Sequence, residues 1–226
     1  MARLFLLTLG FHENFAIRRL TKNSSGGRDV VLLLSIQGPA KAVLTAYESV
    51  KGFASRMGLV VRDLYMVDPE DLASSVVGLL GEVVSLMKGY GLRDVVIDAT
   101  GGVKPLAIAS LMLGMILSSR YGYSVEYYIQ SETSMEYEVR LDERMLRVFS
   151  LKLSRDEARI LKGVLEHPGV SAGQLAGLIE VNYKTLLNRL GKLKKLGLVY
   201  QKGRGGGIYP SPWARIALAL AGEGYG

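Results

Sequence analysis

The sequence contains no cysteine and only two histidines, His12 and His167. Disulfide bonds and thiolate metal sites are therefore excluded, and two isolated imidazoles do not supply the ligands of a zinc site. Residues 1–10 are too few for a signal peptide, and no run of about 18 apolar residues is free of interruption. These absences predict a soluble, cytoplasmic protein with no metal, no other cofactor and no membrane segment.

The charged residues of this 226-residue chain are unevenly distributed. Residues 1–150 contain 16 Lys and Arg against 16 Asp and Glu, whereas residues 151–226 contain 12 against 5. The whole excess of +7 thus lies in the last third of the chain. A charge surplus that served solubility would be spread along the sequence. Because residues 1–150 are neutral overall and residues 151–226 are basic, we expect residues 151–226 to bind a polyanion.

Strands and helices alternate in the first half of the chain. Apolar runs at 3–9, 30–36, 60–67 and 93–98 read as strands, and helices are predicted at 14–20, 40–57, 68–90 and 105–120. This alternation predicts an α/β fold, with a Rossmann-like, mostly parallel sheet and helices on both faces. In the strand order 3-2-1-4, a ligand crevice opens beyond the first and fourth strands.

Three further β-rich segments follow the last of these helices. They lie at 124–130, 136–141 and 145–149, and Asp142-Glu143 reads as a hairpin turn between the last two. We expect them to extend the sheet at one edge.

The stretch from Asp98 to Pro105 joins a strand to a helix through Gly101 and Gly102. Glycines allow a sharp turn and close approach to a ligand, and the free amides at a helix N-terminus attract anions. Thr100 adds a hydroxyl and Lys104 a cation, which predicts a phosphate-binding loop. It is neither a nucleoside triphosphatase loop nor a dinucleotide fingerprint. The alternative is a glycine turn required only for packing.

Short helices dominate residues 151–226. Capping boxes begin at Ser154 and Ser171, Asn182 caps a third helix, and two strands surround a glycine-rich tip. This order predicts a winged helix-turn-helix domain, with residues 182–196 as recognition helix and 198–210 as wing. The alternative is an accessory helical cap whose lysines are merely solvated. The predicted DNA-binding residues are Tyr183, Lys184, Thr185, Asn188, Arg189, Lys192, Lys202 and Arg204.

Residues 8–15 and 98–104 resemble the two signature motifs of CRISPR-associated Rossmann-fold (CARF) domains. With the C-terminal winged helix, the chain is similar to the archaeal CARF transcriptional regulators of CRISPR loci. The resemblance implies a CARF domain at 1–150, a DNA-binding domain at 151–226, and a homodimer that binds a cyclic oligoadenylate, usually the tetra-adenylate. The implied ligand-binding residues are Gly10, Phe11, His12, Thr100, Gly101, Gly102 and Lys104.

The function predicted from these features is a ligand-responsive regulator that binds double-stranded DNA. One alternative is an enzyme, because some CARF proteins cleave their ring without metal; Lys104 would then stabilise the transition state and His12 would move a proton. Another is a regulator that senses a different nucleotide such as NAD. The missing fingerprint and the lack of an acidic ribose partner after the second strand disfavour NAD.

Overall fold

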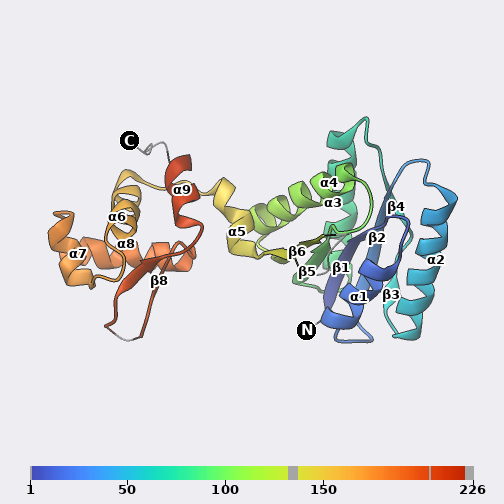
Figure 1. Cartoon of the computed structure of the whole chain (residues 1–226), viewed down its shortest axis with the longest axis horizontal. Helices are drawn as coiled ribbons and strands as arrows, with labels where there is room; N and C mark the ends of the chain where they lie inside the picture. Colours follow the sequence, from blue (N-terminus) through green and yellow to red (C-terminus); the bar gives the residue numbers. More distant parts are fainter. Residues whose placement is uncertain (1, 132–136, 204, 222–226) are drawn as a thin grey trace. The chain divides into compact units, whose positions relative to one another are not determined.

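The computed structural model describes residues 2–131, 137–203 and 205–221. The chain forms two compact units, Met1–Leu146 and Arg147–Gly226. Each unit has its own hydrophobic core, and Figure 1 shows the elements of both.

The first unit is built on a single sheet, which contains seven strands in the described residues, in the order β3-β2-β1-β5-β6-β7 with β4 also paired to β2. The strands are β1 (Arg3–Thr8), β2 (Val30–Ile36), β3 (Val60–Val61), β4 (Tyr65–Val67), β5 (Asp94–Asp98), β6 (Ser124–Gln130) and β7 (Glu138–Leu141). Every pairing is parallel except that of β6 with β7. The order 3-2-1-4 considered for the first four strands is confirmed, and two of the three segments expected to extend the sheet at one edge do so, as β6 and β7.

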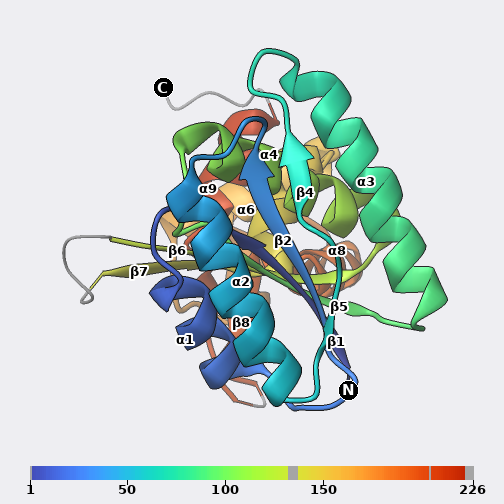
Figure 2. The same cartoon turned by 90° about the vertical axis from the view of Figure 1, so that its right-hand side faces the viewer.

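Helices cover both faces of this sheet, as Figure 2 shows. They are α1 (Asn14–Asn23), α2 (Lys41–Arg56), α3 (Leu72–Gly89) and α4 (Lys104–Ile116), which continues as a π-helical turn, Leu117–Tyr121. Along β1, Leu4 and Leu6 pack with the core under α3 and α4, while Phe5 and Leu7 pack with the core under α1 and α2. Both faces of the strand are therefore buried, which explains why the sequence of β1 is apolar without alternation.

The predicted strand at 60–67 is divided into β3 and β4. Both pair with β2, but Val60 lies opposite Val30 whereas Tyr65 lies opposite Leu34, so one extra residue is inserted between them. An inserted residue bends a strand and locally breaks its ladder. The break coincides with the charged pair Arg62-Asp63.

The predicted strand at 145–149 is wrong, because the chain there forms helix α5 (Glu143–Arg147) and a 3-10 turn, Val148–Ser150. Asp142 is the cause: its carboxylate accepts hydrogen bonds from the amides of Arg144 and Met145 at 2.9 and 3.0 Å and starts the helix. The predicted hairpin turn at Asp142-Glu143 is therefore wrong as well.

Helix α3 is long and apolar enough, by length and composition alone, to cross a membrane. Core helices pass the same test, and Val76, Leu79 and Val83 of α3 are buried against the sheet. These buried residues form one face of the helix, and 28% of its apolar window is buried in all.

Where the structure describes it, the second unit contains three helices, a two-stranded antiparallel sheet and a closing helix. They are α6 (Arg155–Glu166), α7 (Ala172–Leu178), α8 (Tyr183–Lys195), β8 (Val199–Gln201), β9 (Ile208–Pro210) and α9 (Ala214–Leu220). Both predicted capping boxes are present, at Ser154 with Glu157 and at Ser171 with Gln174. The order of elements is the one predicted from the sequence.

Candidate ligand pocket and candidate DNA-binding face

The turn after β1 and the glycine loop after β5 lie against each other. A Cβ on Gly10 would be 2.7 Å from the amide nitrogen of Gly102, and a Cβ on Gly101 would be 2.5 Å from the carbonyl oxygen of Thr8. Gly102 also adopts a φ of +82°, which favours glycine. The glycines are thus required for backbone packing, and that same packing joins the two turns into one surface.

A pocket of about 600 Å³ opens on this surface, at the carboxyl ends of β1, β2 and β5. This volume is typical of a small-molecule site. Its lining is mostly apolar and, among the described residues, contains no carboxylate; it includes Leu9, Gly10, Phe11, His12, Phe15, Ser35, Ile36, Gly38, Pro39, Ala40, Val43, Gly101, Gly102, Val103 and Leu106. In the part of the chain that the structure describes, no group of acidic, histidine or cysteine side chains could hold a metal ion.

Three of the residues that line the pocket have backbone amides without an acceptor in the described part of the chain. The amides of Gly10, Gly101 and Gly102 donate to no acceptor within the described residues. Helix α4 starts directly afterwards, and its N-cap residue, Val103, provides no side-chain cap. Free amides and the positive end of a helix together favour an anion.

The structure brings five of the seven predicted ligand residues together, because Gly10, Phe11, His12, Gly101 and Gly102 all line the pocket. The other two lie outside the lining. Thr100 is buried behind the loop, and Lys104 is exposed on α4.

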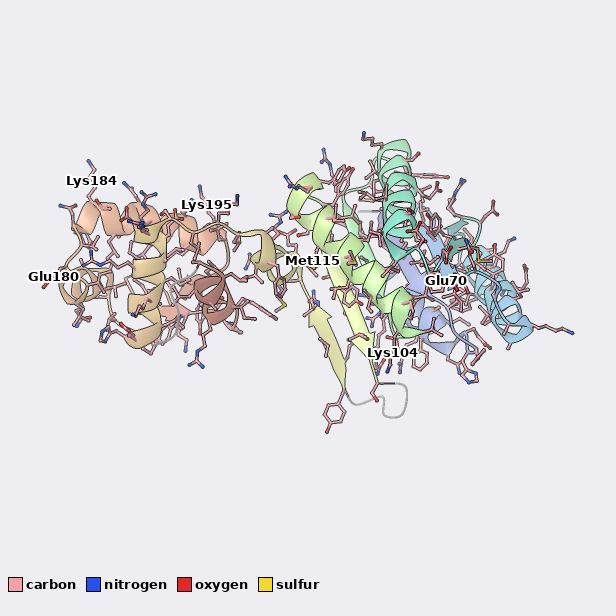
Figure 3. The ribbon with its side chains drawn as sticks, turned by 90° about the horizontal axis from the view of Figure 1, so that it is seen from above. Glu70, Lys104, Met115, Glu180, Lys184 and Lys195 are labelled. Atoms are coloured by element: carbon pink, nitrogen blue, oxygen red, sulfur yellow. The ribbon has the colours of Figure 1, made fainter. Side chains whose placement is uncertain are left out.

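Thr100 supports the loop from behind, contrary to its predicted role as a ligand contact. Its side chain is buried, its hydroxyl oxygen accepts the amide hydrogen of Gln130 at 3.0 Å, and its own amide donates to Asp98 at 2.9 Å. The hydroxyl is therefore directed toward β6. Lys104, the first residue of α4, is exposed (Figure 3) and forms no ion pair with any described residue.

Sequence reasoning missed one wall of the pocket. Phe15 on α1 and residues from the end of β2 to the start of α2, namely Ile36, Gly38, Pro39, Ala40 and Val43, also line it. The predicted order 3-2-1-4 contained the relevant signal, because it places the carboxyl end of the second strand beside that of the first.

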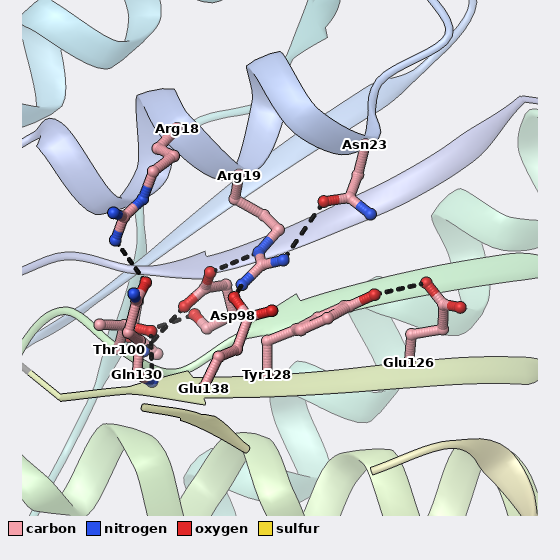
Figure 4. A network of polar contacts seen from close by, with 10 residues as sticks. Arg18, Arg19, Asn23, Asp98, Thr100, Glu126, Tyr128, Gln130 and Glu138 are labelled. Atoms are coloured by element: carbon pink, nitrogen blue, oxygen red, sulfur yellow. Dashed lines mark hydrogen bonds and ion pairs between the residues drawn. The ribbon is translucent and has the colours of Figure 1, made fainter. Parts of the chain in front are cut away.

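A buried ion-pair network lies behind the glycine loop (Figure 4). The guanidinium of Arg19 on α1 contacts Asp98 at the end of β5 at 2.6 Å, pairs with Glu138 on β7, and lies 3.7 Å from the centre of the Tyr128 ring. Burial alone would lower the pKa of Arg19, but the two carboxylates outweigh burial and raise this pKa above its ordinary value. The charged arginine thus ties α1, the loop and the sheet edge together.

On the second unit, α8 presents the predicted recognition residues. The amide oxygen of Asn182 accepts hydrogen bonds from the amides of Lys184 and Thr185 and starts the helix. Tyr183, Lys184, Thr185 and Asn188 are exposed.

Arg189 and Lys192 form ion pairs within the protein. Lys192 lies 2.7 Å from the carboxylate of Glu157, which is fully buried, and Arg189 lies 3.5 Å from Glu157 and 3.4 Å from Asp156. Burial would raise the pKa of Glu157, but hydrogen bonds from Lys192 and Ser154 outweigh burial and lower it. The carboxylate therefore stays charged and holds α8 to the start of α6.

The predicted DNA-binding residues of the wing are Lys202 and Arg204. Lys202 is exposed at the end of β8, with its ammonium 4.9 Å from the centre of the Tyr209 ring. Arg204 lies outside the described residues.

Comparison with known proteins identifies the first unit. Residues 3–142 match the family model of the Csa3 CRISPR-associated Rossmann-like domain. A curated relative from Saccharolobus solfataricus (strain P2), Csa3, is 25% identical over 200 residues, covering 88% of this chain and 81% of the relative. Its name describes it as a CRISPR locus-related, candidate DNA-binding protein.

Two solved structures were also matched. One is Enterococcus italicus Csm6 bound to cyclic hexa-2'-fluoro-hexa-dAMP, with a TM-score of 0.48 and 11% identity, covering 86% of this chain and 55% of that chain. The other is a MarR family transcription regulator, with a TM-score of 0.30 and 16% identity, covering 31% of this chain and 50% of that chain. Both scores are too low to carry an argument about function.

The family match spans more than half of the chain, and it agrees with the observed strand order and with the glycine loop at its centre. It confirms the resemblance to CRISPR-associated Rossmann-fold proteins that the two motifs indicated. The chain therefore belongs to the Csa3 family of CRISPR-associated proteins with a Rossmann-like domain.

Proposed function

We propose that the protein is a ligand-responsive transcriptional regulator of CRISPR loci. Its first unit binds a cyclic oligoadenylate, the tetra-adenylate, and its second unit binds double-stranded DNA. The observation that carries the proposal is the pocket itself. Gly10, Gly101 and Gly102, whose amides donate to no acceptor among the described residues, line it beside the start of α4, and no described carboxylate lines it to repel a phosphate.

The size of the pocket supports a homodimer. A cavity of about 600 Å³ suits part of a ring of four nucleotides, so the remainder of the ring requires a second copy of the chain. Val103 lines the pocket, and Ile108 and Met112, 52% and 42% exposed, follow it along α4. An apolar helix face that continues from the pocket is the surface on which we place the second copy.

DNA binding rests on the second unit. The whole positive excess of the chain lies there, and α8 exposes Lys184 and Asn188 at the start of the predicted recognition helix. The fold of three helices followed by a hairpin supports the winged-helix interpretation.

Cleavage of the ring is the alternative function, and one observation favours it. His12 is exposed and lines the pocket, where it could transfer a proton to or from the ribose or the phosphate. Thr100 and Lys104 do not line the pocket, so His12 is the group to test.

The proposal is tested by titrating the protein with cyclic tetra-adenylate in a calorimeter. We expect saturable binding, and we expect the variant with both His12→Ala and Lys104→Ala to bind at least tenfold more weakly, because His12 lines the pocket and Lys104 directly follows the lining residue Val103. The loss of one charge-assisted contact costs about 1.5–3 kcal/mol. Both side chains are exposed, so the variant should keep the thermal midpoint of the wild type.

Lys88→Ala is the matched control, because Lys88 is an exposed lysine in the last turn of α3, outside the pocket lining. Equal affinity of the double variant and this control would contradict the site. Chromatography of the ring after prolonged incubation separates the two functions. An intact ring supports a regulator, and linear products that disappear with His12→Ala would support the enzyme.

A further inference from the structure

One face of α8 points away from the rest of the second unit. Leu186, Leu190 and Leu193 are buried, and the helical period places Lys184, Asn188, Gly191 and Lys195 on the opposite side. All four are exposed. Figure 3 shows the side chains of Lys184 and Lys195 projecting to the same side of the helix. We refer to these four residues as the outward stripe.

Arg189 and Lys192 lie on the flank of the helix that faces α6. Their cations are matched by Glu157 and Asp156, at distances from 2.7 to 3.5 Å. Contact of either cation with an external phosphate would compete with these carboxylates. The outward stripe carries no such pairing, since neither Lys184 nor Lys195 forms an ion pair among the described residues.

Gly191, in the middle of the stripe, has no structural reason to be glycine. A Cβ at this position would meet nothing within 4 Å, and its φ is not positive. Glycine inside a helix is unfavourable relative to alanine. Gly163 on α6 is the contrast, because there a Cβ would lie 2.6 Å from the Ile179 side chain. The space above Gly191 is therefore open toward an external surface.

We propose that the outward stripe is the surface that enters the major groove of DNA, and that Gly191 allows the helix backbone to approach the bases closely. This inference rests on the proposed DNA-binding function and specifies its contacts. Asn188, next to Gly191 on the stripe, can read adenine through its N6 and N7 groups. Arg189 and Lys192 are positioning residues that hold α8 to α6.

The length of the stripe fits the groove. Lys184 and Lys195 are separated by 11 residues, a rise of about 16 Å along the helix axis. The major groove is about 12 Å wide. The two flexible lysines can therefore reach the phosphates on opposite sides of the groove, while Asn188 and Gly191 lie between them.

The test compares two glycines with the same open surroundings. Gly191→Ala and Gly191→Leu are paired with Gly81→Ala and Gly81→Leu, because Gly81 on α3 is also exposed with nothing within 4 Å of a Cβ. The probe is the duplex that wild-type protein selects from a random-sequence double-stranded library. Both alanine variants should raise the thermal midpoint. Gly191→Leu should weaken DNA binding at least tenfold and Gly191→Ala less, whereas neither change at Gly81 should affect it.

The outcomes separate this inference from the function on which it rests. Wild-type protein that enriches no duplex would contradict the DNA-binding function itself. Wild-type protein that binds its selected duplex, together with folded Gly191→Leu of equal affinity, would overturn only the role of the stripe.

A second measurement tests the lysines. Lys184→Gln and Lys195→Gln should each reduce the slope of log affinity against log salt by about one. Lys192→Gln should lower the thermal midpoint and leave this slope unchanged. A reduced slope for Lys192→Gln with unchanged slopes for the other two would reverse the assignment.

Discussion

Two arginines of the first unit show how burial determines what an arginine ion pair contributes to the free energy of unfolding. Arg19 is 4% exposed and lies between the carboxylates of Asp98 and Glu138, whereas Arg140 is 57% exposed and pairs with Glu126 near the sheet edge. Removing one partner from a buried pair leaves an unmatched charge out of water, while an exposed pair is replaced by hydration.

We therefore predict that Arg19→Met lowers the free energy of unfolding by about 3–5 kcal/mol, and that Arg140→Met lowers it by less than about 1 kcal/mol. Urea titration of both variants measures the difference. Arg19→Met should also weaken ring binding, because Asp98 holds the amide of Thr100 in the glycine loop. Similar losses for the two variants would show that the buried network does not stabilise the loop.

The turn between α7 and α8 sets the direction of the outward stripe. Glu180 in this turn has a φ of +51°, the only positive value for a residue other than glycine in the described chain. Residues with a Cβ are strained in this conformation, and the Glu180 side chain is exposed, so it gains no packing in return.

Glu180→Gly should consequently raise the free energy of unfolding by about 1 kcal/mol, because glycine adopts this conformation without the strain. Glu180→Ala is the control, since it removes the same charge and keeps the Cβ. If the alanine variant were stabilised as much as the glycine variant, then charge and not backbone strain would be the cause.

At the scale of the whole molecule, we propose that the ligand connects two copies of the chain. Ile108 and Met112 expose apolar surface on α4, in contrast to the buried Leu106 and Ala109 on its other side. Burial of such surface in a dimer is favourable, and a charge introduced there would have to be desolvated.

The variant with Ile108→Glu and Met112→Glu should therefore sediment as a monomer at concentrations where the wild type is a dimer. It should keep its fold, since both positions are exposed, and should lose high-affinity ring binding. Tyr90→Glu, at the C-terminal end of α3, adds a charge at another exposed apolar residue and should leave the dimer intact. A dimeric double variant would place the interface elsewhere.

Many structural features of this protein follow from residues that are close to one another in the sequence. The alternation of apolar runs and helical periods predicted a mostly parallel sheet, because strands joined by helices of this length run parallel. Ser154, Ser171 and Asn182 predicted helix starts correctly, since a cap bonds to amides only two or three residues away. The glycine loop was located for the same reason: a turn between strand and helix is specified by adjacent residues.

The tertiary structure alone decided which groups face one another. Apolar residues at 145–149 suit a strand or a helix, and long-range packing favours the helix, because Leu146 is buried in the core of the first unit and the Ser118 hydroxyl donates to the carbonyl of Glu143, 25 residues away. Thr100 was expected in the ligand site, but its bond to Gln130, which is 30 residues away, turns it toward β6. The sequence predicted Arg189 and Lys192 as DNA-binding cations, but in the fold Glu157 of α6 lies beside them. Periodicity fixes the face of an element, whereas the partner of a charge depends on chain folding over long separations.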